Sequence, residues 1–136
     1  MKALWYAGMV MLLAFSLVSV RAQTAMEAII ETPDITFADL KTAIAEKKVT
    51  LLDCNGSESY AKGHLPGALD FTAAGENLAK LLPEDKAMLV VAYCGGPKCK
   101  AYKAGVAAAK KLGYTNLKHF SGGLSGWQEA GETLEK

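Results

Sequence analysis

The feature that most constrains the fold is an apolar run followed at once by a glycine-rich loop. The run Ala87–Tyr93 reads AMLVVAY, which has the length and composition of a strand buried on both faces. It is followed by CGGPKCK, residues Cys94–Lys100, here called the cysteine loop, and then by the alanine-rich segment 101–112, which favours a helix. This order of strand, loop and helix predicts part of a parallel sheet.

The rest of the chain repeats this alternation. Further strands are predicted at Val49–Asp53, 68–71 and 116–120, and further helices from the N-cap Thr36 to Lys47, around 76–82, and after the turn at Ser121 with Trp127 in the core. Segment 54–68 is predicted to be a loop because it is rich in Gly, Ser and Asn. The sequence therefore predicts an α/β fold with a mostly parallel central sheet of about five short strands and helices on both faces.

The helix predicted after the cysteine loop is expected to pack closely on the sheet. Small and apolar residues recur along it, at Ala101, Ala104, Ala108 and Leu112, and we expect this stripe to face the strands. Gly113 is expected to end the helix as its C-cap.

The N-terminus predicts export. Lys2 precedes the apolar run Ala3–Val20, and small residues at Val20 and Ala22 fit a cleavage site before Gln23. We predict a signal peptide over 1–22, a short lead over 23–34 and one domain over 35–136, with a periplasmic or secreted location. The alternative is an uncleaved membrane anchor, because the run is long enough to cross a bilayer.

Charge gives no reason to expect nucleic acid as a partner. Without residues 1–22 the chain keeps 13 basic and 14 acidic side chains, a net charge of −1. The distribution is uneven, since Lys86–Gln128 contains seven lysines and no acid. These lysines are either an ordinary solvated surface or a positive field around the cysteine loop that favours anions.

The cysteines do not predict a metal site or a disulfide scaffold. There are three, Cys54, Cys94 and Cys99, and an odd number leaves at least one thiol unpaired within the chain. Structural zinc requires four ligands with closely spaced Cys pairs, and His64 and His119 are too scattered to complete such a set. We expect no metal and no cofactor.

The cysteine loop has the composition of an anion-binding nucleophile site. It follows a strand at the sheet edge where open α/β folds bind ligands, and it precedes the positive end of a helix. Gly95 and Gly96 allow backbone N–H groups to converge on one point, and Lys98 and Lys100 favour a thiolate. Two interpretations remain open for Cys94: a nucleophile, or an inert buried residue at a strand end.

Three stretches in order resemble the rhodanese (sulfurtransferase) family. They are LLDCNGSESYAKGHLPGALDF (51–71), VVAYCGGPKC (90–99) and LGYTNLKHFSGGLSGW (112–127). The resemblance covers about residues 36–131 and implies the three-layer rhodanese-like fold. It also implies that Cys94 accepts sulfane sulfur as a persulfide, that Asp53 braces the loop region, and that His64 supports the fold.

The sequence departs from the family pattern at three positions. Asn55 stands where the family often has Arg, Cys54 replaces a small aliphatic residue and is expected in the core, and Cys99 occupies a loop position where Arg is frequent. Lysines are then the only cations of the loop, and a lysine lacks the bidentate fork of arginine. Thiosulfate is therefore expected to be a poor donor.

The resemblance leaves several functions open. The first is an exported sulfurtransferase that uses thiosulfate, a polysulfide or a persulfide as donor and cyanide, a thiol or a protein as acceptor. The second is a carrier or binding module for sulfane sulfur that does not turn over rapidly. A thiol redox protein using Cys94 and Cys99 is a further alternative, because Cys99 is either a resolving thiol or a packing residue. Phosphatase chemistry is disfavoured, because Lys100 stands where such loops carry Arg.

Overall fold

The computed structural model describes residues 31–136 of the chain; the predicted signal segment and most of the lead, 1–30, lie outside the described residues. The described part contains one four-stranded parallel sheet with the order β2-β1-β3-β4. Its strands are β1 (Val49–Asp53), β2 (Leu69–Asp70), β3 (Leu89–Tyr93) and β4 (Leu117–His119). No helix within residues 31–136 is long and apolar enough to cross a membrane.

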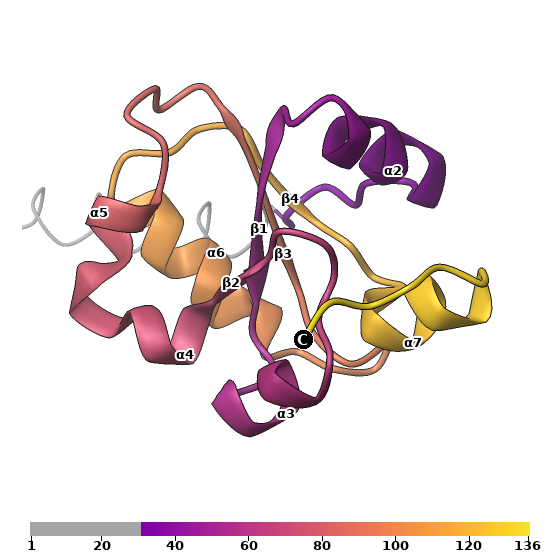
Figure 1. Cartoon of the computed structure of the whole chain (residues 1–136). Coiled ribbons are helices and arrows are strands. Elements are labelled where there is room, and N and C mark those ends of the chain that lie inside the picture. Colours follow the sequence, from indigo (N-terminus) through magenta and orange to yellow (C-terminus); the bar gives the residue numbers. More distant parts are fainter. Residues whose placement is uncertain (1–30) are drawn as a thin grey trace, which may run out of the picture. The chain divides into compact units, whose positions relative to one another are not determined.

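Helices cover both faces of the sheet, as predicted (Figure 1). One face is covered by α2 (Phe37–Ala45) and α7 (Gly123–Glu129), and the other by α4 (Phe71–Ala74), α5 (Leu78–Leu81) and α6 (Tyr102–Lys111). The short helices η1 (Gly75–Asn77) and α3 (Ser57–Lys62) complete the set, with α3 near the carboxyl ends of the strands. The predicted three-layer α/β fold is confirmed.

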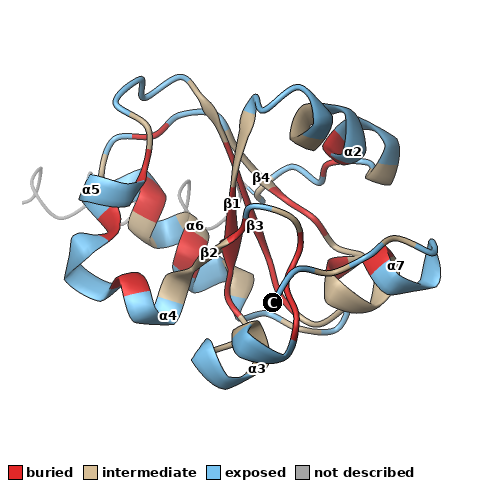
Figure 2. Ribbon diagram, in the orientation of Figure 1, coloured by how far each residue is buried: buried red, intermediate tan, exposed pale blue. Residues whose placement is uncertain are grey.

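The central strands supply a core on each face of the sheet. Side chains alternate along a strand, so Val90 packs with the α5 and α6 layer while Val91 packs with the α2 and α7 layer. Figure 2 shows this burial along β1 and β3 and on the inner sides of the helices. Full burial of an aliphatic side chain contributes about 1.5–3 kcal/mol to the stability of the fold. The apolar runs of β1 and β3 therefore predicted these strands well.

The expected count of about five strands was wrong for the described part of the chain. Beyond β4 a single bridge joins Asp34 to His119, with Ile35 N–H donating to His119 O at 2.8 Å. Pro33 lacks an N–H group, and Thr36 already caps α2 by accepting from Asp39 N–H at 3.1 Å. Pairing beyond β4 therefore stops at the single Asp34–His119 bridge and does not become a strand.

Two short helices were missed because they are too short to show a hydrophobic period. Helix α3 lies in the stretch predicted to be a loop, and its N-cap Gly56 has a φ of 90° and no capping side chain. Helix α4 begins where a strand was predicted to end, because the side chain of Asp70 accepts from Ala73 N–H at 3.1 Å and caps it.

Close packing of α6 on the sheet depends on Gly105 and on one half of the predicted stripe, Ala108 and Leu112, which pack against the core. A Cβ atom at Gly105 would lie 2.7 Å from Cys54 Sγ and 3.5 Å from Ala92 Cβ. Gly105 and Ala109 are buried, whereas Ala101 and Ala104 of the predicted stripe are exposed. The helix is so rich in alanine that composition could not indicate which side faces the sheet. Gly113 follows α6 with a φ of +96°, as expected of a C-cap residue.

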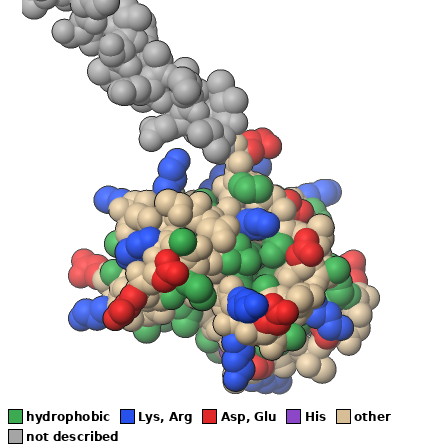
Figure 3. All heavy atoms as spheres, turned by 90° about the horizontal axis from the view of Figure 1, so that it is seen from above, with side chains coloured by type: hydrophobic (Ala, Val, Ile, Leu, Met, Phe, Trp, Pro, Cys, Tyr) green, Lys and Arg blue, Asp and Glu red, His purple; other side chains and the backbone are tan. Residues whose placement is uncertain are grey.

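Charged side chains are mixed on the face shown in Figure 3. Lysines and acids are interspersed there with hydrophobic side chains. On this face of the described residues no single sign of charge dominates.

Candidate active site

The cysteine loop begins where the order of the strands reverses. From β1 the chain crosses to β2 on one side, whereas β3 is followed by β4 on the other side. Asp53 at the end of β1 pairs with Tyr93 at the end of β3, and Cys94 comes next. Open α/β sheets bind ligands at this type of switch point, outside the carboxyl ends of the strands.

Helix α7 holds the first half of the cysteine loop. Leu124 N–H donates to Cys94 O at 2.8 Å, and Ser125 N–H donates to Gly95 O at 3.0 Å. In a trans peptide the N–H points opposite to the C=O, so the N–H groups of Gly95 and Gly96 point away from α7. These two groups find no acceptor among residues 31–136, which leaves them available to bind an anion.

Gly96 of the loop and Gly123 of α7 allow the loop and the helix to pack closely. A Cβ atom on Gly96 would lie 2.9 Å from Ser125 Oγ, and one on Gly123 would lie 2.5 Å from Cys94 O. Neither Gly95 nor Gly96 has a positive φ. The sequence predicts free N–H groups at the loop glycines but gives no sign of the contacts with Gly123 and Ser125, because these contacts join distant segments.

A tight turn in the second half of the loop brings the two cysteines together. Cys99 N–H donates to Gly96 O at 3.1 Å, with Pro97 at the second position of the turn, where its fixed φ is favourable. Cys94 and Cys99 form a disulfide, and their Cα atoms are 6.2 Å apart. The structure thus pairs Cys99 with Cys94. From the sequence, Cys99 could be either a resolving thiol or a packing residue.

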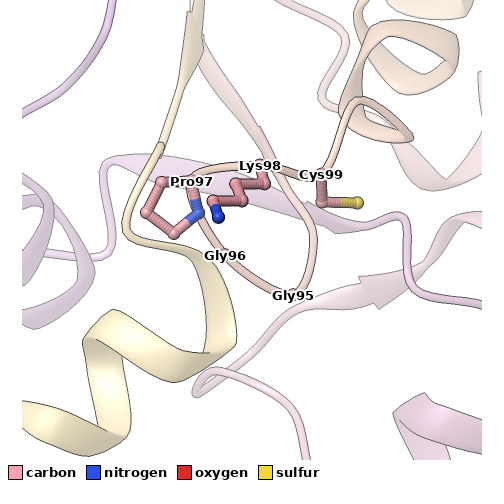
Figure 4. A pocket seen from close by; sticks show the side chains of 5 residues that line it. All are labelled: Gly95, Gly96, Pro97, Lys98 and Cys99. Atoms are coloured by element: carbon pink, nitrogen blue, oxygen red, sulfur yellow. The ribbon is translucent and has the colours of Figure 1, made fainter.

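The loop lines a shallow hollow of about 400 Å³. Figure 4 shows the five residues that line it, Gly95, Gly96, Pro97, Lys98 and Cys99. Lys98 is exposed at this hollow, whereas Lys100, also predicted as a loop cation, is exposed but does not line it. Of the six residues predicted to form the anion-binding loop, Gly95 to Lys100, all but Lys100 therefore line this hollow.

A buried network joins the ends of β1 and β3 beneath the loop. Asp53 is fully buried and accepts from Tyr93 OH at 2.7 Å and from Asn55 N–H at 2.8 Å. Tyr93 OH in turn accepts from Leu65 N–H at 3.0 Å. Burial, and then the hydrogen bond to Asp53, raise the pKa of Tyr93, so it remains a neutral donor. Asp53 thus lies beneath the loop region that the family resemblance implies it braces. Its hydrogen-bond partner, Tyr93, was not predicted from the sequence.

Asn55 borders the loop. Its Oδ1 would lie 3.5 Å from a Cβ atom on Gly95, and its buried Nδ2 has no hydrogen-bond partner in the described part of the chain. This amide occupies the position where the family often has Arg. It can donate to a ligand but carries no charge.

His64 contacts Tyr60 and the C-terminal segment. Its ring stacks on Tyr60 with 3.8 Å between centroids, and Nδ1 lies 2.9 Å from Tyr60 O. Its backbone exchanges two hydrogen bonds of 2.9 Å with Glu135 near the C-terminus. No hydrogen bond within residues 31–136 links the His64 ring to the cysteine loop. The predicted supporting role remains a prediction.

Burial also shifts the pKa values of Cys54 and His119. Burial, and then the charge of Asp53, raise the pKa of Cys54 to about 12, so this thiol is not ionised at neutral pH. Its predicted place in the core is confirmed. His119 stacks on Tyr102 with 3.3 Å between ring centroids, and burial lowers its pKa, although Asp34 acts in the opposite direction.

The fold and the site define a class: an α/β domain with a cysteine at the switch point of a parallel sheet. The chain matches the family model described as Rhodanese-like domain over residues 36–130. It therefore belongs to the rhodanese-like family.

Two curated proteins are similar in sequence. The chain is 28% identical over 109 residues to a human thiosulfate:glutathione sulfurtransferase, covering 71% of this chain and 94% of that protein. It is 32% identical over 104 residues, 75% of this chain, to an HTH-type transcriptional regulator of Mycobacterium tuberculosis, but it spans only 44% of the regulator's length. The family match and the human relative support a role within the sulfurtransferase family.

Solved structures share the fold. A Bacillus halodurans protein superposes with a TM-score of 0.65 at 22% identity, covering 87% of this chain and 85% of that chain. The human single-domain sulfurtransferase superposes with a TM-score of 0.59 at 21% identity, covering 73% and 97% of the two chains. At these identities the likeness shows the fold alone.

Proposed function

We propose that the chain is a sulfurtransferase that carries sulfane sulfur as a persulfide on Cys94. The observation that carries this proposal is the arrangement of the loop: Cys94 directly follows β3 at the switch point, and the N–H groups of Gly95 and Gly96 are turned away from α7 without an acceptor in the described chain. Such donors stabilise a thiolate and, later, the outer sulfur of a persulfide.

The proposed reaction begins with the reduced protein, in which the Cys94–Cys99 disulfide is open. The Cys94 thiolate attacks the outer sulfur of a donor, for example thiosulfate; the bond between the donor's two sulfurs breaks, and sulfite leaves with the electron pair. A thiol or another thiophilic acceptor then attacks the outer sulfur of the persulfide and restores the Cys94 thiolate.

The donor class follows from the charges around the hollow. Lys98 supplies a point charge, and Asn55 supplies an uncharged amide where the family often has Arg. The sulfonate oxygens of thiosulfate then lack a bidentate partner, so we propose a polysulfide or a persulfide, which have no such oxygens, as the better donor. The human relative is named for thiosulfate and glutathione, and both compounds belong in the first assays.

Intact-mass analysis tests the proposal. The reduced full chain should gain the mass of one sulfur atom during brief exposure to polysulfide, with a smaller fraction converted by thiosulfate at equal concentration. Cys94→Ser should gain none, while Cys54→Ala, which alters a buried core thiol, should behave like the wild type. Sulfur uptake that persists in Cys94→Ser would contradict the proposal.

A steady-state assay separates an enzyme from a carrier. An enzyme should transfer many equivalents of sulfur per Cys94 to cyanide or a small thiol under continuous reduction. A carrier would load one equivalent and then discharge it only to a protein partner. Transfer that stops after one equivalent would favour the carrier.

We also propose that the protein is exported. The support comes from Lys2, the apolar run Ala3–Val20 and the small residues Val20 and Ala22 before Gln23. N-terminal sequencing of the exported form should begin at Gln23. A product that keeps residues 1–22 and sediments with membranes would instead indicate an anchor.

A further inference from the structure

We propose that Cys99 is a resolving thiol that expels the sulfur held on Cys94 as sulfide. The inference rests on the proposed persulfide of Cys94 and assigns the fate of its sulfur when no acceptor arrives. It concerns the second cysteine of the cysteine loop, which persulfide chemistry at Cys94 does not itself require.

The two sulfurs can meet with the loop as it is folded. Their Cα atoms are 6.2 Å apart, within the usual range of about 4.4–6.8 Å for a disulfide. The turn from Gly96 to Cys99, closed by the Cys99 N–H bond to Gly96 O at 3.1 Å, produces this approach. The backbone therefore needs no rearrangement before Cys99 can attack.

The balanced step forms one bond and breaks another. The Cys99 thiolate attacks the inner sulfur of the Cys94 persulfide, the Cys94 Sγ; a bond forms between the two cysteine sulfurs, and the bond to the outer sulfur breaks. The outer sulfur leaves with the electron pair as HS⁻, and the Cys99 sulfur is oxidised. From the persulfide and the thiol, the products are the Cys94–Cys99 disulfide and hydrogen sulfide.

The loop favours attack on the inner sulfur. The N–H groups of Gly95 and Gly96, which have no acceptor among residues 31–136, stabilise negative charge on the departing outer sulfur. Lys98 and Lys100 flank Cys99 in the chain, are exposed, and favour its thiolate form. No acidic residue between Lys86 and Gln128 opposes this field.

Burial determines how the disulfide is reopened. Cys94 is only 1% exposed, whereas Cys99 is half-buried. An external thiol or dithiol reductant therefore attacks the Cys99 sulfur, and Cys94 leaves as the thiolate that its N–H donors stabilise. A second thiol equivalent then releases Cys99, so each cycle oxidises two external thiols to one disulfide.

The test compares Cys99→Ser with Cys54→Ala, because each of these variants keeps two of the three cysteines. The reduced full chain is exposed anaerobically to one equivalent of polysulfide with no other thiol present. The donor itself leaves sulfide or a shorter polysulfide on transfer, equally in every variant that loads; beyond this amount, the wild type and Cys54→Ala should release about one further equivalent of sulfide and lose the mass of two hydrogens. Cys99→Ser should keep the added sulfur, with sulfide release slowed roughly tenfold or more, since it lacks the intramolecular thiol.

The outcomes separate this inference from the proposed function. If no variant gains sulfur at any time, the persulfide itself is refuted. If wild type and Cys99→Ser hold the added sulfur equally long, the persulfide stands and the resolving role is overturned. Equal thermal unfolding of the two variants confirms that the comparison is not a folding effect, and Cys99→Ala provides a second variant should Cys99→Ser be unstable.

Discussion

Replacing Gly123 by alanine should destabilise the protein by about 3 kcal/mol and disrupt the cysteine loop. Gly123 has a φ of +59°, where alanine costs about 1 kcal/mol. The added Cβ would also lie 2.5 Å from Cys94 O, 2.7 Å from Gly96 N and 2.9 Å from the Gly95 carbonyl carbon. These are backbone atoms, and moving them strains the hydrogen bonds from α7, each of which contributes about 1 kcal/mol.

Gly131→Ala is the matched control for this prediction. Gly131 follows the same helix and has a φ of +81°, but nothing lies within 4 Å of the position of its Cβ. It should lose only about 1 kcal/mol, the contribution of the backbone conformation alone. Urea unfolding of both variants under reducing conditions isolates the effect of the contact. Equal losses would show that α7 does not press on the loop.

Asp53→Ala should cost a similar amount, about 3 kcal/mol, because it leaves two buried donors without an acceptor. The donors are Tyr93 OH and Asn55 N–H, at 2.7 Å and 2.8 Å from the carboxylate. Tyr93→Phe should cost less, about 2 kcal/mol, since it removes the hydroxyl and leaves Leu65 N–H unpaired. In the double variant the losses should be less than additive, because the two residues share one bond.

Asp85→Ala supplies the control for Asp53. The Asp85 carboxylate also accepts from the N–H two residues further on, that of Ala87 at 2.9 Å, but it is exposed. Water replaces the lost bond there, so the expected change lies within about 0.5 kcal/mol. Equal losses at Asp53 and Asp85, measured by urea unfolding, would contradict a bracing role for the buried network.

Burial on both faces explains which parts of the fold could be predicted. Strand β1 has the predicted bounds, and β3 lies within its predicted run, because continuous apolar stretches of that length have few other places in a small domain. Thr36 could be placed as an N-cap because the bond that caps α2 is local in sequence. The short helix α3 had no comparable pattern.

The site was only partly predictable, because its contacts join distant segments. Cys94, its glycines and Asp53 could be proposed from their order in the chain and from a family resemblance. The bond of Asp53 to Tyr93 depends on the register of two strands 40 residues apart, and the role of Gly123 depends on α7 lying against the loop. A single sequence contains no direct record of either contact. The sequence does give one indication of the buried network. Tyr93 ends the apolar run of β3, and a buried tyrosine hydroxyl requires a hydrogen-bond partner.

The hydrogen bonds from α7 reach only as far as Gly95, so the two halves of the cysteine loop are held in different ways. Helix α7 anchors the carbonyl groups of Cys94 and Gly95, whereas the turn from Gly96 to Cys99 is closed by its own bond and is followed by the exposed Lys100. The carbonyl groups beside the nucleophile are therefore bonded to α7, whereas Cys99 is held by its own turn and by packing against the core. This difference in support suits the roles proposed above, in which Cys94 holds the sulfur and the neighbouring Cys99 expels it when no acceptor comes.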